Sequence, residues 1–99
     1  MVKFEIFAGL HTASGDCSPT TVQRNRDHLR RLADDQLPGY TWQDVTGRWD
    51  GRNEASVILT FIGGADHAQR IRNLAGQYKE AAEQESVMIT QALIEADFV

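Results

Sequence analysis

The stretch Glu54-Ala-Ser-Val-Ile-Leu-Thr-Phe-Ile62 decides the fold, because its side chains alternate with the period of a β-strand. One face of the strand carries Ala55, Val57, Leu59 and Phe61, and the other carries Ser56, Ile58, Thr60 and Ile62. Both faces are apolar in the latter half, which is typical of a strand buried on two sides. We therefore expect Glu54–Ile62 to lie at the centre of a sheet.

The segments before this strand predict a hairpin, a helix and a first strand. Tyr40–Thr46 alternates as a strand, Gly47 marks a bulge or the strand end, and Asp50-Gly51 predicts the turn. Further upstream, Ser18-Pro19 is a typical helix start, so a helix is expected from Pro19 to Gln36. Its apolar stripe is Val22, Leu29, Leu32, Ala33 and Leu37, with Arg26 at the stripe edge. Lys3–Gly9 alternates as the first strand.

The segments after the central strand predict a second helix and a last strand. Asp66 is suited to cap the helix, whose stripe is Ala68, Ile71, Leu74, Ala75, Tyr78 and Ala82. Gln84–Val99 alternates to the end of the sequence. At ~3.3 Å per residue it would reach ~50 Å, too long for a small sheet, so it must bend, break or pair with a partner.

This order predicts an α+β fold of the ferredoxin-like β-α-β-β-α-β type. Residues 1–99 form one domain, with a four-stranded antiparallel sheet and two helices on one face. The other face then needs cover, which we expect from a second copy in a homodimer or higher oligomer. The candidate residues for this open face are Phe7, Trp42, Ile58, and Val87 or Ile89.

The composition limits which classes of binding partner are expected. The formal net charge is −4, which makes nucleic acid an unlikely ligand, and no apolar run approaches the ~20 residues of a membrane span. The cluster Arg24, Arg26, Arg30 and Arg31 is more often a solvated helix face than a binding patch. Cys17 is the single cysteine, which suits a reducing cytoplasm.

Four ordered segments resemble an uncharacterised family of small bacterial and phage proteins, a domain of unknown function. They are Phe7–Leu10, Tyr40–Trp49, Glu54–Val57, and Tyr78 followed by Gln84–Val87. Another aromatic usually stands in that family where this chain has Ala82. The resemblance implies the ferredoxin-like fold and a phage or bacterial origin, but it transfers no catalytic residue.

Polar and aromatic side chains at strand ends form the candidate ligand site. The candidates are Arg48, Trp49, Glu54, Ser56, Gln84, Glu85 and Ser86. Arginine can bind a phosphate or carboxylate, and tryptophan can stack on a base. The topology predicts two clusters at sheet ends, joined only in a dimer. The simpler interpretation pairs Arg48 with Glu54 across the hairpin and leaves Gln84–Ser86 as a turn cap.

The sequence predicts no metal site, no cofactor and no catalytic residue set. The favoured hypothesis is an oligomeric, non-enzymatic binding protein that sequesters a small anionic or nucleotide-derived signalling ligand, as an anti-defence protein of a phage. The alternatives are a dimeric ferredoxin-like enzyme that uses His11, Tyr78 or Glu54 on a small organic substrate, and an inhibitor of a host enzyme.

Overall fold

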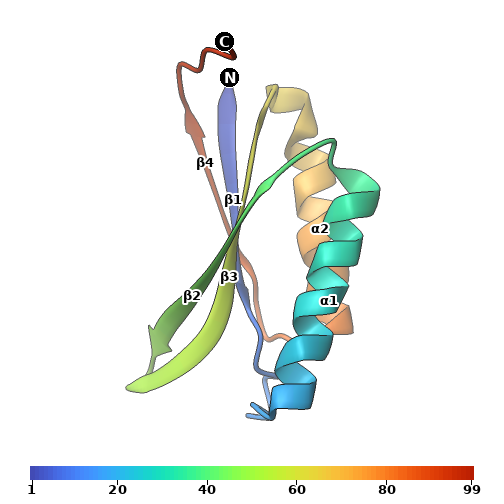
Figure 1. The fold of residues 1–99 in the computed structure, drawn as a ribbon, viewed down its shortest axis with the longest axis vertical. Helices are drawn as coiled ribbons and strands as arrows, with labels where there is room; N and C mark the ends of the chain where they lie inside the picture. The colour runs from blue at the N-terminus through green and yellow to red at the C-terminus, as the bar shows by residue number, and fades with distance from the viewer.

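The computed structural model describes residues 1–99 and confirms the predicted order of elements. They are β1 (Val2–Gly9), α1 (Pro19–Gln36), β2 (Thr41–Trp49), β3 (Arg52–Gly63), a 3-10 turn (Ala65–His67), α2 (Ala68–Ala81) and β4 (Met88–Leu93). The strands form one sheet in the order β2-β3-β1-β4, and every neighbouring pair is antiparallel. This is the ferredoxin-like α+β arrangement, with both helices on one face (Figure 1).

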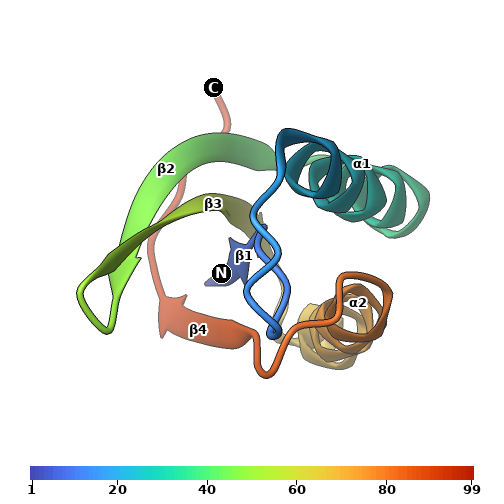
Figure 2. The ribbon, with the colours of Figure 1, turned by 90° about the horizontal axis from the view of Figure 1, so that it is seen from below.

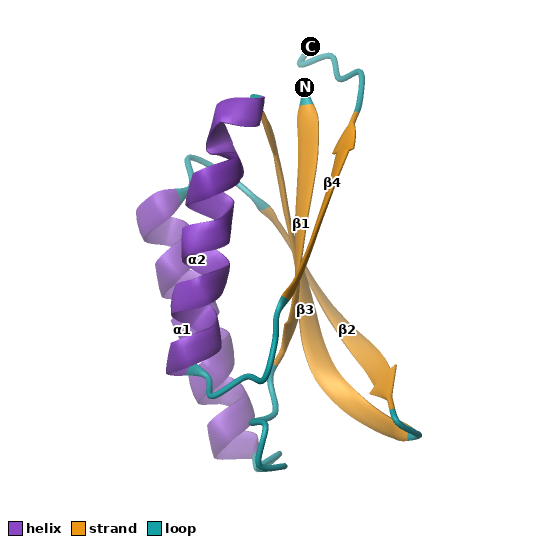
Figure 3. Cartoon of the chain, turned by 180° about the vertical axis from the view of Figure 1, so that it is seen from behind, coloured by secondary structure: helices purple, strands orange, loops and turns teal.

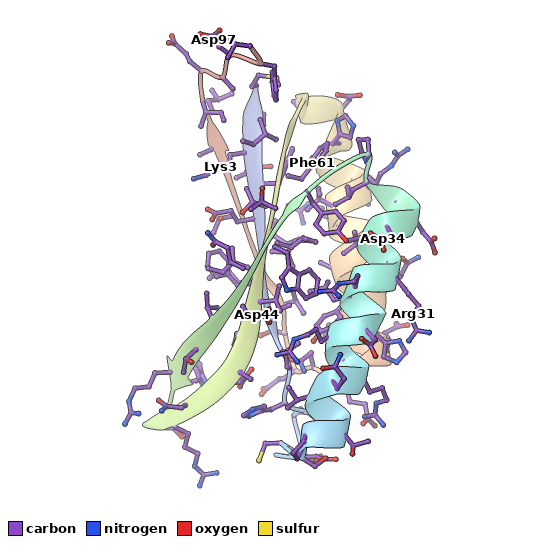
Figure 4. The ribbon with its side chains drawn as sticks, viewed as in Figure 1. Lys3, Arg31, Asp34, Asp44, Phe61 and Asp97 are labelled. Carbon is purple, nitrogen blue, oxygen red and sulfur yellow. The ribbon has the colours of Figure 1, made fainter.

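The core lies between the sheet and the two helices. Alternate residues of β1, among them Phe4 and Ile6, are buried on this side. Figure 4 shows the alternation directly: Phe61 lies on the helix side of the sheet, whereas Lys3 points to the open side. Neither helix is long and apolar enough to cross a lipid bilayer.

Helix α1 begins where its sequence predicted, at Ser18-Pro19. The Ser18 side chain accepts a hydrogen bond from the Thr21 amide, and Asp16 accepts from the Ser18 amide at 3.0 Å. The hydrogen bonds to Ser18 and Thr21 hold the pKa of Asp16 below its usual range. The fully buried stripe differs from the expected one, because its members are Thr21, Asn25, Leu29 and Ala33. Arg26 lies at the stripe edge, as predicted, and pairs with Asp44 of β2 at 3.0 Å.

The hairpin between β2 and β3 is longer than predicted. Pairing continues through Gly47, which faces Glu54, as far as Trp49, which faces Arg52. Gly47 is therefore neither a bulge nor the strand end. Positive φ angles of 50° at Asp50 and 75° at Gly51 form the predicted turn. Near this turn the two strands bend away from the helices, so the sheet is strongly curved (Figures 2 and 3).

The last strand is shorter than its alternation suggested, and it breaks, which is one of the three outcomes that its length predicted. Only Met88–Leu93 pairs with β1, while Gln84 and its neighbours form a connection and Ile94 onward leaves the sheet. The strand breaks because β1, its only partner, ends at Val2, which faces Leu93. The expected Asp66 cap is also absent: a 3-10 turn precedes α2, which has no side-chain cap.

The open face carries fewer apolar residues than predicted. Phe7 and Ile58 do lie on it, facing each other across β1 and β3. Trp42 instead faces the buried Leu59 and lies on the helix side, where the Arg30 guanidinium covers its ring at 4.7 Å. Val87 and Ile89 also pack against the core. Met88 takes their place on the open face, opposite Phe7.

Candidate functional site

A groove of about 830 Å³ lies on the open face of the sheet, toward the β2–β3 turn. We call it the open-face groove. Its lining includes every predicted site residue: Arg48, Trp49, Glu54, Ser56, Gln84, Glu85 and Ser86. The expectation of two separate clusters is wrong, because the curved hairpin and the connection before β4 border the same hollow within one chain.

Gly9, the last residue of β1, forms the floor where the two groups meet. A Cβ atom on Gly9 would overlap Oε1 of Glu54 and would lie 3.0 Å from Oε1 of Gln84. A glycine in a strand commonly marks such a close approach. The missing side chain therefore lets a carboxylate oxygen from β3 and an amide oxygen from the last connection converge over β1.

The orientation of the Gln84 amide is fixed by its nitrogen. Nε2 donates to the backbone carbonyl of His11 and, at 3.3 Å, to that of Ala82. Because both partners accept, the amide oxygen is the atom that faces Gly9 and Glu54. The groove thus presents two acceptor oxygens side by side.

The Glu54 carboxylate has no cationic partner within the chain. The three ion pairs of the structure are Lys3–Glu5, Arg26–Asp44 and His67–Asp66. The predicted contact between Arg48 and Glu54 does not form, because Arg48 faces Asn53 across the hairpin and donates to its side chain at 2.8 Å. An unpaired, half-buried carboxylate beside a second acceptor suits a ligand that brings positive charge or N–H donors.

His11 lies beside this acceptor pair and borders the groove. Its Nε2 accepts a hydrogen bond from the Ala55 amide at 3.3 Å. The acidic residues of the lining are Glu54 and Glu85.

Tyr78 supports the site from below. It is completely buried on α2, and its hydroxyl donates to the Gly9 carbonyl at 2.5 Å. Burial, together with the nearby Glu54 carboxylate, raises the pKa of Tyr78 far above its usual range. The phenol is therefore a neutral hydrogen-bond donor that holds the Gly9 carbonyl in place.

The rim of the groove is aromatic and polar. Trp49 lines it from the hairpin end and is 80% exposed, so one face of its indole is free to stack on a ring. Ser56 lies close to Gly47, with its hydroxyl 3.1 Å from where a Gly47 Cβ would be. Cys17 is exposed and lies outside the lining, and no three His, Cys, Asp or Glu side chains come together as a metal site.

Two contributors to the site were missed from the sequence. Gly9 is not among the candidate site residues from the sequence, although a glycine in a strand signals close approach of another group. Asn25 was absent from the predicted stripe of α1, because a polar residue there is typical of a solvated face.

A second hollow, about 330 Å³ and mostly apolar, lies beside Val2 and Leu93.

Fold and groove together define a class: a small ferredoxin-like α+β protein with an acceptor-rich groove on the face that its helices leave open. No protein-family model matches the chain, and no curated protein matches it in sequence. The comparison with solved structures does find similar folds.

One similar structure is a phage SAM lyase in complex with S-methyl-5'-thioadenosine. It has a TM-score of 0.67 and 19% identity, over 92% of this chain and 79% of the lyase. A DUF3240 family protein from Shewanella baltica has a TM-score of 0.58 and 8% identity, over 99% of this chain and 94% of that protein. An Arabidopsis thaliana protein also has a TM-score of 0.58, with 9% identity over the full length of both chains. At these identities the likeness shows the fold.

Proposed function

We propose that the open-face groove binds S-adenosylmethionine (SAM) and that the chain cleaves it to S-methyl-5'-thioadenosine. The observation that carries the proposal is the pair of acceptor oxygens, Glu54 Oε1 and Gln84 Oε1, that converge over Gly9 without a cation from the chain. The similar fold of a phage SAM lyase that binds this thioadenosine supports the choice of ligand.

The charge of the groove suits SAM better than a purely anionic ligand. Two glutamates, Glu54 and Glu85, line it, whereas the Arg48 guanidinium is bound to Asn53. SAM carries an α-ammonium, a sulfonium and an α-carboxylate, so it offers positive charge for Glu54. Its adenine is a flat ring suited to the exposed face of Trp49. A nucleotide-derived ligand, one of the two classes expected from the sequence, is thus retained, and the simple anion is not.

We assign the acceptor pair to the α-ammonium of SAM. An ammonium has three N–H donors, whereas a sulfonium has none. Cleavage moves the electron pair of the bond between sulfur and Cγ onto sulfur, which becomes a neutral thioether. A carboxylate held against the sulfonium would stabilise the substrate more than the transition state. The ammonium keeps its charge throughout the reaction. Binding it to the acceptor pair therefore orients the methionine part of SAM without raising the activation barrier.

The electrons that replace the broken bond can come from the substrate itself. Attack of the α-carboxylate oxygen on Cγ forms a carbon–oxygen bond as the carbon–sulfur pair leaves on sulfur. The products are S-methyl-5'-thioadenosine and a lactone that keeps the ammonium, so no water, metal or oxidant enters the balance. The role of the protein is to hold the methionine part of SAM in the folded conformation that this attack requires.

Incubation of the purified chain with SAM, followed by chromatography, tests the proposal. We expect S-methyl-5'-thioadenosine to accumulate beyond one equivalent of protein. Binding of SAM without turnover would instead favour sequestration, the function favoured by the sequence. Neither binding nor turnover would contradict both. Either activity in a host cytoplasm would lower free SAM, in keeping with an anti-defence protein.

Self-association is a second part of the proposal. Trp49 is 80% exposed and Met88 is 55% exposed, and Phe7 and Ile58 lie between them on the open face. Exposed apolar groups around a functional groove are typical of a surface that another chain covers. We expect light scattering at micromolar concentration to give a multiple of the 11.1 kDa chain mass. A mass of 11.1 kDa at all concentrations would contradict this part.

A further inference from the structure

Three consecutive backbone carbonyls leaving β1 are each held by a side chain from a different segment. The Gly9 carbonyl accepts from the Tyr78 hydroxyl of α2, and the His11 carbonyl accepts from the Gln84 amide. Between them, the Leu10 carbonyl accepts from Nδ2 of Asn25 on α1, at 2.8 Å. The backbone under the open-face groove is therefore fixed from three sides.

Asn25 has an environment that opposes a polar side chain. It is 0% exposed, within the buried stripe of α1 that also contains Leu29. Its second polar atom, Oδ1, is buried and has no hydrogen-bond partner. An unsatisfied buried acceptor costs about 1–3 kcal/mol. Residues that break such local rules are commonly retained for function.

Leu10, whose carbonyl Asn25 binds, connects to the acceptor pair on both sides. Its amide donates to the Ala55 carbonyl at 2.9 Å, and the Ala55 amide donates to the His11 ring at 3.3 Å. The preceding residue, Gly9, is the floor over which Glu54 and Gln84 converge. Asn25 itself does not line the groove.

We propose that Asn25 is a positioning residue of the open-face groove, acting through the Leu10 carbonyl to hold Gly9 and His11 in place under the acceptor pair. For its kinetic effect this inference rests on the proposed function. Its structural effect, an ordered Leu10 peptide, does not depend on any ligand.

The kinetic test uses Asn25→Leu, which keeps a side chain of similar shape but removes the donor. We expect kcat for SAM cleavage to fall at least tenfold, with a smaller change in KM and cooperative thermal unfolding retained. Partial unfolding of the variant would also lower the apparent kcat and leave KM unchanged. The thermal unfolding data therefore distinguish a loss of folded protein from a loss of positioning. The matched control is Thr21→Val, because Thr21 is also buried on α1 but its hydrogen bonds go to Ser18 and Asp16. A twofold or smaller change of kcat in Asn25→Leu would overturn the proposal.

Amide hydrogen exchange gives a test that does not require SAM. We expect the Leu10 amide to exchange at least tenfold faster in Asn25→Leu than in the wild type, and an unchanged rate would overturn the proposal. If the wild type neither binds nor cleaves SAM, but the Leu10 amide exchanges faster in the variant, the proposed function is contradicted and the positioning role of Asn25 stands. Should Asn25→Leu not fold, the wild type decides: the Asn25 side-chain amide protons should exchange at least tenfold more slowly than those of the exposed Asn73, and equal rates would overturn it.

Discussion

Replacing Glu54 with glutamine is expected to lower kcat/KM for the cleavage of SAM about 100-fold. The amide keeps the size of the side chain and one acceptor oxygen, but it removes the charge that faces the ligand ammonium. Hydrogen bonds to charged groups contribute roughly 1.5–3 kcal/mol, and 1.4 kcal/mol is a factor of ten. Initial rates measured by chromatography of S-methyl-5'-thioadenosine check the expectation.

The loss should be specific to this carboxylate. Glu80→Gln removes the same charge from the exposed side of α2, and its rate should stay within twofold of the wild type. Glu54 forms no ion pair that the substitution would break, so the thermal unfolding of Glu54→Gln should stay close to that of the wild type. Equal rates for Glu54→Gln and the wild type would remove Glu54 from the site.

Adding a single methyl group at Gly9 should have an effect of similar size. The Cβ of Gly9→Ala would occupy the position of the Glu54 carboxylate oxygen and press against Gln84 Oε1. The Glu54 oxygen must then move by more than an ångström and the Gln84 oxygen by a few tenths of an ångström. A displacement of about an ångström can cost roughly 100-fold in rate. Steady-state kinetics should show the fall mainly in kcat.

Gly39→Ala is the matched control for this substitution. Nothing lies within 4 Å of a Cβ at Gly39, and its φ is not in the left-handed region, so alanine fits there. Its activity should be that of the wild type. If Gly9→Ala were equally active, the convergence of Glu54 and Gln84 over β1 would have no part in the function.

Strand and helix patterns sufficed to predict the fold. The alternation of Glu54–Ile62 placed that strand next to two others, and Ser18-Pro19 placed the start of α1, both as observed. The length of the last strand was not predictable from alternation, because it is set by its partner β1, which ends at Val2. The alternation of side chains within one strand does not show at which residue the neighbouring strand ends.

The sequence was enough to select residues that line the groove, but not to predict how they are arranged in it. Residue types and strand ends selected seven side chains that all line the open-face groove. Their union in one groove depends on the curvature of the hairpin, which alternation does not encode. Trp42 shows the same limit: its aromatic ring suggested the open face, but Arg30 covers it on the helix side. Asn25 was missed because burial of a polar residue depends on a partner carbonyl far along the chain.

The most direct test of the groove as the ligand site is an NMR titration of labelled protein with S-methyl-5'-thioadenosine. We predict saturable shifts of the backbone amides of residues that line the groove: Gly9, His11–Ala13, Gly47–Trp49, Glu54, Ser56 and Gln84–Ser86. Shifts confined to the apolar hollow beside Val2 and Leu93, or none at millimolar ligand, would contradict the account.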